Sequence, residues 1–171
     1  VVAPKHELGA YLLVGINLVP NPDGLGAMNL LGFGIKYDRI EGGFFMSDFD
    51  ETIERRLIFP NVFALDYRHG GGFISYDLLS PNDYLTVSGH AIFQRGDMVW
   101  RRVDTGEDFL RATFNLYQFG FKVESPVLRY VRPGISLGYQ GISDFQLTGV
   151  SKEDFSGLFI GFTVKIGYFN Q

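Results

Sequence analysis

The sequence predicts an all-β protein, a single closed antiparallel barrel over residues 1–171, and three observations lead to this prediction. Glycine (22 residues) and aromatic residues (16%) are abundant, a composition that argues against a helical protein. Apolar residues recur at every second position through most of the chain, which is the period of a strand. Clusters of turn-forming residues separate these stretches at short intervals.

The final stretch, residues 156–169, shows the alternation most clearly. One face is wholly apolar and carries Leu158, Ile160, Phe162, Val164, Ile166 and Tyr168. The other face carries Phe159, Gly161, Thr163, Lys165 and Gly167. Since successive side chains of a strand point to opposite faces, this strand separates an apolar environment from a more polar one.

Two features indicate that the apolar face points outward, toward lipid. Glycine is frequent on the opposite face, where it suits the crowded interior of a small barrel but would weaken a strand exposed to water. Aromatic residues gather at strand ends, as membrane-interface girdles require; these are Tyr37, Tyr67, Trp100, Tyr139, Tyr168 and Phe169. The expected fold is therefore a transmembrane outer-membrane barrel, and the alternative is a soluble barrel that encloses an apolar ligand.

Composition excludes several other classes of protein. No apolar run reaches the roughly 18 residues that a membrane helix needs, so strands must do any spanning. The chain has no cysteine, which removes disulfides and thiolate chemistry. Its net charge of −4 comes from scattered charges without a basic stripe, so we expect no nucleic-acid partner. Without a cluster of histidines and acidic residues, we also expect no metal and no cofactor.

Segments that carry the alternation predict eight to ten strands, with ten preferred. They cover about residues 6–19, 27–38, 43–49, 61–68, 73–80, 84–94, 98–104, 109–124, 130–141 and 156–169. Eight strands follow if residues 43–58 and 98–104 lie outside the barrel. In the count of ten, His69–Gly72 and Arg95–Asp97 are tight periplasmic turns, and residues 80–83 turn at the outer end. An even count places both termini on the periplasmic side.

Two segments interrupt the pattern. Residues 43–49 form a strand that leads into a loop, or residues 47–57 form a short helix with an acidic first turn and Pro60 as its stop. Within residues 109–124, the apolar residues change parity between Leu116 and Tyr117, which predicts a β-bulge at this point.

The chain resembles the small bacterial outer-membrane barrels of the OmpA, OmpX and OmpW type. The resemblance covers most of the length and lies in the strand pattern, most clearly in the final strand from Leu158 to Phe169. It implies a location in the outer membrane of a Gram-negative bacterium. Such proteins usually finish on a terminal phenylalanine that the assembly machinery recognises, whereas here Asn170 and Gln171 follow Phe169.

The polar face brings charged residues to the barrel interior. The predicted interior set is Lys36, Asp38, Asp66, Arg68, Asp77, His90, Arg132 and Lys165. A barrel of this size is barely wide enough for its own side chains. We therefore expect these charges to pair and fill the lumen as a salt-bridge network rather than to line a pore.

One pattern points to catalysis as an alternative. Ser88 and His90 share a strand face about 7 Å apart, and Asp77 lies on a neighbouring predicted strand, so the three form a weak hydrolase constellation. No specific motif such as G-x-S-x-G accompanies them. We therefore expect a non-enzymatic structural or interaction role, with membrane lipid, including lipopolysaccharide, or another outer-membrane protein as partner. An outer-membrane lipid acyl hydrolase or transferase is the alternative.

Overall fold

The computed structural model describes residues 8–49, 53–58, 61–82, 84–125, 130–143 and 145–170. These residues form nine strands and one short 3₁₀ helix. The strands are β1 (Leu8–Asn21), β2 (Gly24–Tyr37), β3 (Ile40–Phe49), β4 (Ile53–Ile58), β5 (Asn61–Asn82), β6 (Leu85–Arg102), β7 (Asp108–Glu124), β8 (Val131–Ile142) and β9 (Gly157–Asn170). The 3₁₀ helix η1 (Glu153–Phe155) precedes β9. No helix formed by the described residues is long and apolar enough to cross a membrane.

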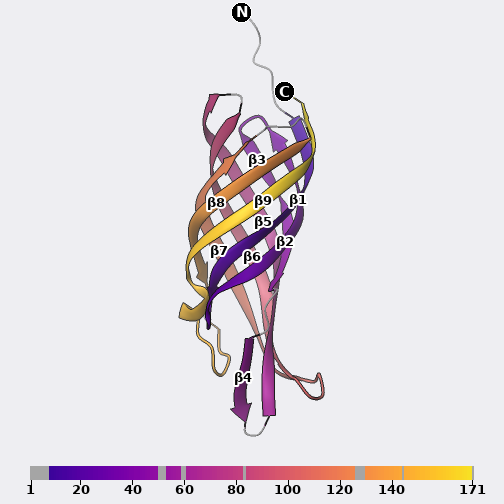
Figure 1. Cartoon of the computed structure of the whole chain (residues 1–171), viewed down its shortest axis with the longest axis vertical. Coiled ribbons are helices and arrows are strands. Elements are labelled where there is room, and N and C mark those ends of the chain that lie inside the picture. Colours follow the sequence, from indigo (N-terminus) through magenta and orange to yellow (C-terminus); the bar gives the residue numbers. More distant parts are fainter. Residues whose placement is uncertain are drawn as a thin grey trace, which may run out of the picture.

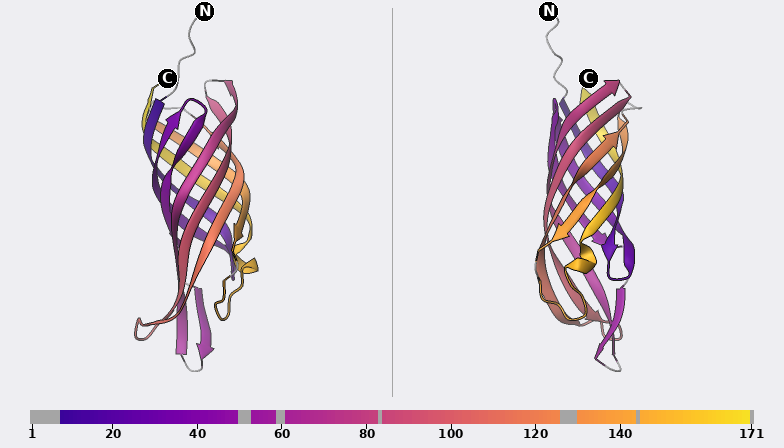
Figure 2. Two further views of the ribbon diagram at one scale, coloured as in Figure 1. Left: turned by 180° about the vertical axis from the view of Figure 1, so that it is seen from behind. Right: turned by 90° about the vertical axis from the view of Figure 1, so that its left-hand side faces the viewer.

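All of these strands except β4 form one antiparallel ring of eight (Figure 1). The order around the ring is β1, β2, β3, β5, β6, β7, β8 and β9. Residues 8–18 of β1 pair with residues 160–170 of β9, and β3 pairs with β5, so each strand of the ring has two hydrogen-bonded neighbours. β1 begins and β9 ends at the same end of the ring (Figure 2). We call this the proximal end and the opposite one the distal end.

The preferred count of ten strands is wrong because two expected turns lie in the middle of strands. His69–Gly72 of β5 pairs with residues 93–96 of β6 in a continuous ladder. Gly71 permits this close approach, since a Cβ on it would lie 2.0 Å from the carbonyl oxygen of Phe93. Glycine here marks two backbones that run close together rather than a turn. The connection between β5 and β6 consequently lies at the proximal end, beyond residues 80–82, and not at the end opposite to the termini as predicted.

The segment after β2 forms strands rather than a helix. β3 pairs with β5 up to Asp48, and β4 pairs with the distal part of β5 from Ile53 to Ile58. The alternative of a helix over residues 47–57 is therefore wrong wherever this segment is described, because its backbone is paired with β5. β4 pairs only with β5 among the described strands and stands beyond the ring (Figure 1).

The outer wall of the proximal half is apolar. Leu158 is 69% exposed, whereas Lys165, on the opposite face of the same strand, is 1% exposed. The same orientation holds around the ring, where the exposed residues include Leu12, Ile16, Leu31, Phe33, Ile35, Phe44, Ile74, Tyr76, Phe119, Phe121, Ile135, Leu137, Ile160 and Ile166. We call this surface the apolar belt. The strands thus turn their apolar face outward, as the last strand predicts.

The distal half has the opposite arrangement. On β5, Phe63, Leu65 and Tyr67 are buried, while Arg68 is exposed on the outer face. On β6 and β7 the buried set continues with Met98, Trp100, Phe114 and Leu116. Because the alternation along each strand is unbroken, the apolar residues change from the outer to the inner face midway along these three strands.

This inversion explains the parity change between Leu116 and Tyr117. Leu116 is buried, Tyr117 is exposed, and β7 pairs with both of its neighbours in continuous register at this point. The predicted β-bulge is therefore wrong. The pairing of β6 and β7 shifts register between Trp100 and Arg101, at the far distal end.

The connection between β8 and β9 closes the distal half from inside. The ring of Phe155 stacks on that of Tyr67, with centroids 5.3 Å apart. Trp100 Nε1 donates a 2.8 Å hydrogen bond to the carbonyl oxygen of Thr148, and Gln140 Nε2 donates one to that of Phe155. We call residues 145–156 the cap. The apolar cluster that it joins, which also includes Val19, Met28 and Phe159, is the distal core.

Trp100 should report whether the cap is docked. It is the single tryptophan of the chain and is fully buried, so we predict blue-shifted emission and weak quenching by acrylamide. Phe155→Ala removes the ring that packs on Tyr67, which should lower the free energy of unfolding by about 3–5 kcal/mol and make Trp100 accessible to the quencher. Leu158→Ala, in the apolar belt, is the control and should leave quenching unchanged. Equal quenching in the Phe155 variant and the parent would contradict the role of the cap.

Candidate functional site: the ion network inside the ring

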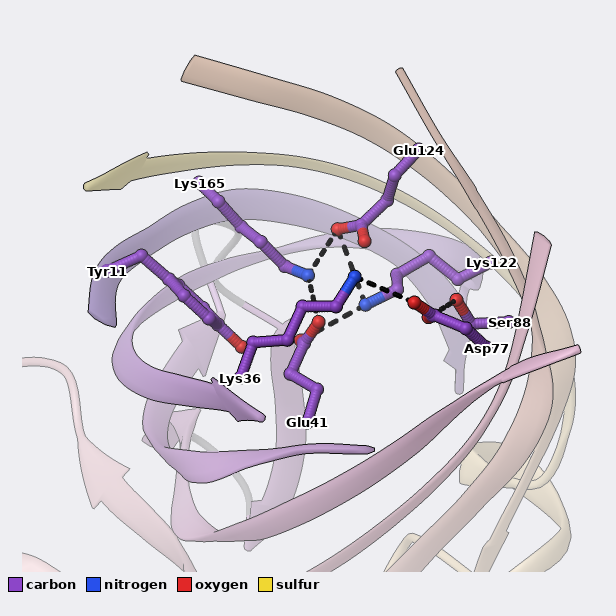
Figure 3. Close-up of polar contacts among 8 residues, drawn as sticks. All are labelled: Tyr11, Lys36, Glu41, Asp77, Ser88, Lys122, Glu124 and Lys165. Carbon is purple, nitrogen blue, oxygen red and sulfur yellow. Dashed lines mark hydrogen bonds and ion pairs between the residues drawn. The ribbon is translucent and has the colours of Figure 1, made fainter. Parts of the chain in front are cut away.

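Charged side chains from five strands meet inside the proximal half of the ring (Figure 3). They are Lys36 of β2, Glu41 of β3, Asp77 of β5, Lys122 and Glu124 of β7, and Lys165 of β9. All six are buried and lie on the strand faces opposite to the apolar belt. We call this set the ion network.

Glu41 is the centre of the ion network. Its carboxylate accepts hydrogen bonds from the Tyr11 hydroxyl at 2.5 Å and from Lys122 Nζ at 3.2 Å, and it pairs with Lys165. Glu124 contacts the same two ammonium groups, with its Oε1 3.3 Å from Lys122 Nζ and 2.5 Å from Lys165 Nζ. Four charges of alternating sign thus form a closed set. Since each contacts two opposite charges, the cost of removing them from water is offset.

Within the ion network, Lys36 and Asp77 form a second group that also contacts Ser88 of β6. Lys36 Nζ lies 2.7 Å from Asp77 Oδ2, and the Ser88 hydroxyl donates a 2.7 Å hydrogen bond to Asp77 Oδ1. Near the proximal end, the Arg132 guanidinium lies 3.8 Å from the centroid of the Phe169 ring. Lys36 and Asp77 thus link β2 to β5 across β3, whereas Ser88 with Asp77 and Arg132 with Phe169 join neighbouring strands.

The structure brings part of the predicted interior set together. Lys36, Asp77, Arg132 and Lys165 are buried inside the ring. His90 lies on the inner face of β6, where its Nδ1 is buried.

Asp38, Asp66 and Arg68 do not lie in the interior. Asp38 is exposed in the turn between β2 and β3, where its φ is 55°. Asp66 and Arg68 lie on the outer face of the distal half and pair there, with Arg68 Nε 3.3 Å from Asp66 Oδ1. Their prediction as interior residues is wrong because apolar side chains occupy the inner face of β5 at this level.

Glu41, Lys122 and Glu124 are absent from the predicted interior set. Glu41 precedes two glycines, a sequence typical of a turn, but it belongs to β3. Lys122 and Glu124 alternate with the exposed Phe121 and Val123. That alternation is the signal that could have placed both charges inside.

The predicted membrane-interface aromatics divide into two groups. Tyr37, Tyr139 and Tyr168 are exposed on the outer wall, and their interface role stays a prediction. Tyr67, Trp100 and Phe169 are buried inside, so their prediction as interface residues is wrong. The first two belong to the distal core and Phe169 stacks on Tyr11.

The residues considered for catalysis do not form a triad. Ser88 is fully buried and bonds to Asp77, whereas the His90 ring packs edge-on against Phe159, with centroids 6.0 Å apart. A serine nucleophile needs a base within hydrogen-bonding reach of its hydroxyl, and no bond joins Ser88 to His90, both of which the structure describes. Over the described ranges, no group of three or more His, Asp or Glu is placed to hold a metal ion.

No protein-family model matches the chain, and no curated protein matches it. Solved structures do match. Neisserial surface protein A matches with a TM-score of 0.62 and 11% sequence identity, and the match covers 94% of this chain and 96% of that protein's chain. The N-terminal β-barrel domain of Pseudomonas aeruginosa OprF has a TM-score of 0.56 and 11% identity, covering 95% and 97%. This chain has the fold of the small outer-membrane β-barrel proteins.

A third outer-membrane barrel extends the match. Ail, the attachment invasion locus protein of Yersinia pestis, in a structure with the heparin analogue sucrose octasulfate, has a TM-score of 0.53 and 10% identity, covering 98% of this chain and all of its own. The resemblance drawn from the final strand is therefore confirmed at the level of the fold.

Removing Glu41 should destabilise this outer-membrane barrel fold. Glu41→Gln leaves Lys122 and Lys165 each with one carboxylate fewer inside the ring, and breaking a buried ion pair costs about 3–5 kcal/mol. Urea unfolding of the refolded protein in detergent, followed by Trp100 fluorescence, measures the loss. Asp108→Asn is the control, because Asp108 pairs with Arg101 at an exposed site, where an ion pair contributes little. An equal shift of the midpoint in both variants would speak against the ion network as a cross-link.

Proposed function

We propose that this chain is a non-enzymatic, single-domain barrel of a bacterial outer membrane, with its distal end as an interaction surface outside the cell. The observation that carries the proposal is the apolar belt around an ion-paired interior. Soluble monomers rarely expose contiguous apolar surface beyond a few hundred Å², because each Å² removed from water is worth about 25 cal/mol. A soluble barrel for an apolar ligand needs the reverse arrangement of faces.

The belt matches the height of a bilayer. On β1 it extends from Leu8 to Leu18, and on β9 from Leu158 to Tyr168. A tilted transmembrane strand needs roughly 9–11 residues. Of the exposed tyrosines, Tyr37 and Tyr168 lie toward the proximal ends of their strands and Tyr139 toward the distal end of β8, which suits two membrane interfaces.

We assign the proximal end to the periplasm. Bacterial outer-membrane barrels have short periplasmic turns and longer extracellular loops. The connection from β2 to β3 at the proximal end is only residues 38–39. The distal end has an equally short connection at residues 22–23, but it also carries the cap and the hairpin of β4 and β5 (Figure 2). The distal half, with apolar residues inside and charges outside, is then the part that water surrounds.

Introduced cysteines test this orientation, because the chain has none of its own. Thr105→Cys, in the exposed connection from β6 to β7, should react with a bulky polyethylene-glycol maleimide on intact cells. Ser80→Cys, exposed near the proximal end of β5, should react only after the outer membrane is permeabilised. The reverse pattern would contradict the orientation, and recovery of both variants in the soluble fraction would contradict the membrane location.

Arginines lie on the outer wall directly beyond the belt. Arg95 is exposed on the same face of β6 as Phe93. Arg68 of β5 pairs with Asp97, which is two residues beyond Arg95 on β6, so the two arginines are neighbours on the outer wall. Within the described part of the chain, Arg95 makes no ion pair. A guanidinium recognises phosphate through paired hydrogen bonds. We therefore propose the phosphates of lipopolysaccharide as the partner of Arg68 and Arg95.

Arg68 is itself paired with Asp66, at 3.3 Å on the outer face. The arginines further from the apolar belt are held by a different carboxylate. Arg101 and Arg111 both bond to Asp108, at 3.1 and 3.0 Å, and the hydrogen bond from Arg101 holds the pKa of the Asp108 carboxyl below its usual value. Ail, of the same fold, was solved with a polyanionic sugar, sucrose octasulfate. This supports an anionic partner for the outer wall, and the two arginines nearest the belt offer the best place for it.

The double variant Arg68→Gln/Arg95→Gln should weaken binding of purified lipopolysaccharide by tenfold or more, since charge-assisted hydrogen bonds contribute about 1.5–3 kcal/mol each. Titration of the detergent-solubilised protein with lipopolysaccharide, followed by its thermal unfolding midpoint, measures the change. The double variant Arg101→Gln/Arg111→Gln removes the same charge further from the belt and should have a smaller effect. Equal losses in the two would show that only net charge matters.

A further inference from the structure

A small cavity lies in the lumen between the ion network and the distal core. Its volume is about 50 Å³. Glu41 and Lys122 of the ion network line it, and so does Phe159 of the distal core. A water molecule needs about 10–15 Å³ on the same measure, so on the order of three to five fit.

Four polar side chains from four different strands line this cavity without a protein partner. The atoms concerned are Asn17 Oδ1 of β1, Ser75 Oγ of β5, His90 Nδ1 of β6 and Thr163 Oγ1 of β9, which are buried and accept or donate no hydrogen bond. Ser75 and Asn17 are almost fully buried as whole residues, at 2% and 3% exposure. Buried polar atoms in native proteins are nearly always bonded to protein or to ordered water.

The surrounding backbone is arranged to hold these groups at one level of the ring. Ser75 and His90 are direct pairing partners across β5 and β6, and Asn17 pairs with Gly161 across β1 and β9. Gly161 leaves room for the carboxamide, since a Cβ on it would lie 2.3 Å from Asn17 Oδ1. The cavity wall therefore gathers polar atoms from opposite sides of the lumen.

We propose that this cavity is a hydration site that holds a small cluster of ordered water molecules, as a structural part of the ion network. Water both donates and accepts, and the four atoms include a carboxamide oxygen and two hydroxyls that require such a partner. The ammonium group of Lys122 in the wall disfavours a metal cation, and the volume is too small for an organic ligand.

The water cluster hydrates ions that the protein has removed from bulk solvent. Glu41 and Lys122 both face the cavity, and buried ion pairs are stable only when their remaining hydrogen-bonding positions are satisfied. Phe159 of the distal core, Phe45 and Phe73 complete the cavity wall with apolar side chains. We therefore expect these waters to be present in every molecule and to exchange slowly.

Removal of single hydroxyls separates a wet cavity from a dry one. In a wet cavity, Ser75→Ala and the isosteric Thr163→Val each remove a hydrogen bond to water, and the unfolding equilibrium constant should rise about fivefold, the effect of one net hydrogen bond. In a dry cavity, the same variants remove an unsatisfied polar atom and should stabilise the protein. Ser47→Ala is the matched control, because its hydroxyl is also buried without a partner but does not line the cavity.

Water-to-protein magnetisation transfer in the full chain, refolded in deuterated detergent micelles, gives a direct test that does not need a variant to fold. We expect cross-peaks from water to the Thr163 methyl group and to the amide of Ser75, and none to the amide of Ser47. Their presence supports the hydration site. Their absence at both cavity positions, or stabilisation by Ser75→Ala and Thr163→Val, would overturn it. These results concern only the lumen and are independent of the membrane orientation and of lipopolysaccharide.

Discussion

The fixed alternation of side chains along a strand is the constraint on which the rest of this structure depends. A strand that stays in register cannot move its side chains to the other face. Where the outer wall is apolar, the inner face must therefore use the remaining positions, and here these carry the ion network and a small cluster of Tyr11, Leu13 and Phe169. Midway along β5, β6 and β7 the pattern is reversed, and the inner face becomes the apolar distal core. The same paired strands are thus apolar outside in the proximal half and apolar inside in the distal half. Their pairing register is unbroken where the two arrangements meet.

The ion network pairs charges that the apolar belt separates from water. The wall of the ring is apolar on the outside, so a charge inside the ring has little access to solvent and must be paired. The closed set of Glu41, Lys122, Glu124 and Lys165 meets this need with contacts from three strands. Such a network is a weaker source of stability than apolar packing of the same volume. It joins β3, β7 and β9 to one another at one level of the ring.

The parts of the fold that follow from local alternation could be predicted from sequence. The final strand and the separation of Lys165 from its apolar face follow from a period of two, and the outward direction of that face follows from the glycines on the opposite one. The number of strands could not, because Gly70–Gly72 and Gly96 have the composition of turns but allow close approach inside a ladder. The placement of Tyr67, Trp100, Asp66 and Arg68 failed for a different reason. Each prediction assumed one polarity for the whole wall, although on β7 the change of parity between Leu116 and Tyr117 marks the point where it reverses.

If the distal half is the interaction surface that we propose, its internal packing bears on the cost of binding. Loops at the mouth of a barrel must usually be ordered when they bind, and each immobilised side chain costs binding free energy. Here the outer arginines stand on strands that extend beyond the belt, and the distal core holds those strands from inside. Trp100 ties the cap to the same core through its bond to Thr148. If this surface binds the proposed partner, substitutions on the outer face of β5 and β6 would change the binding while the inner face, the cap and the apolar belt keep their packing.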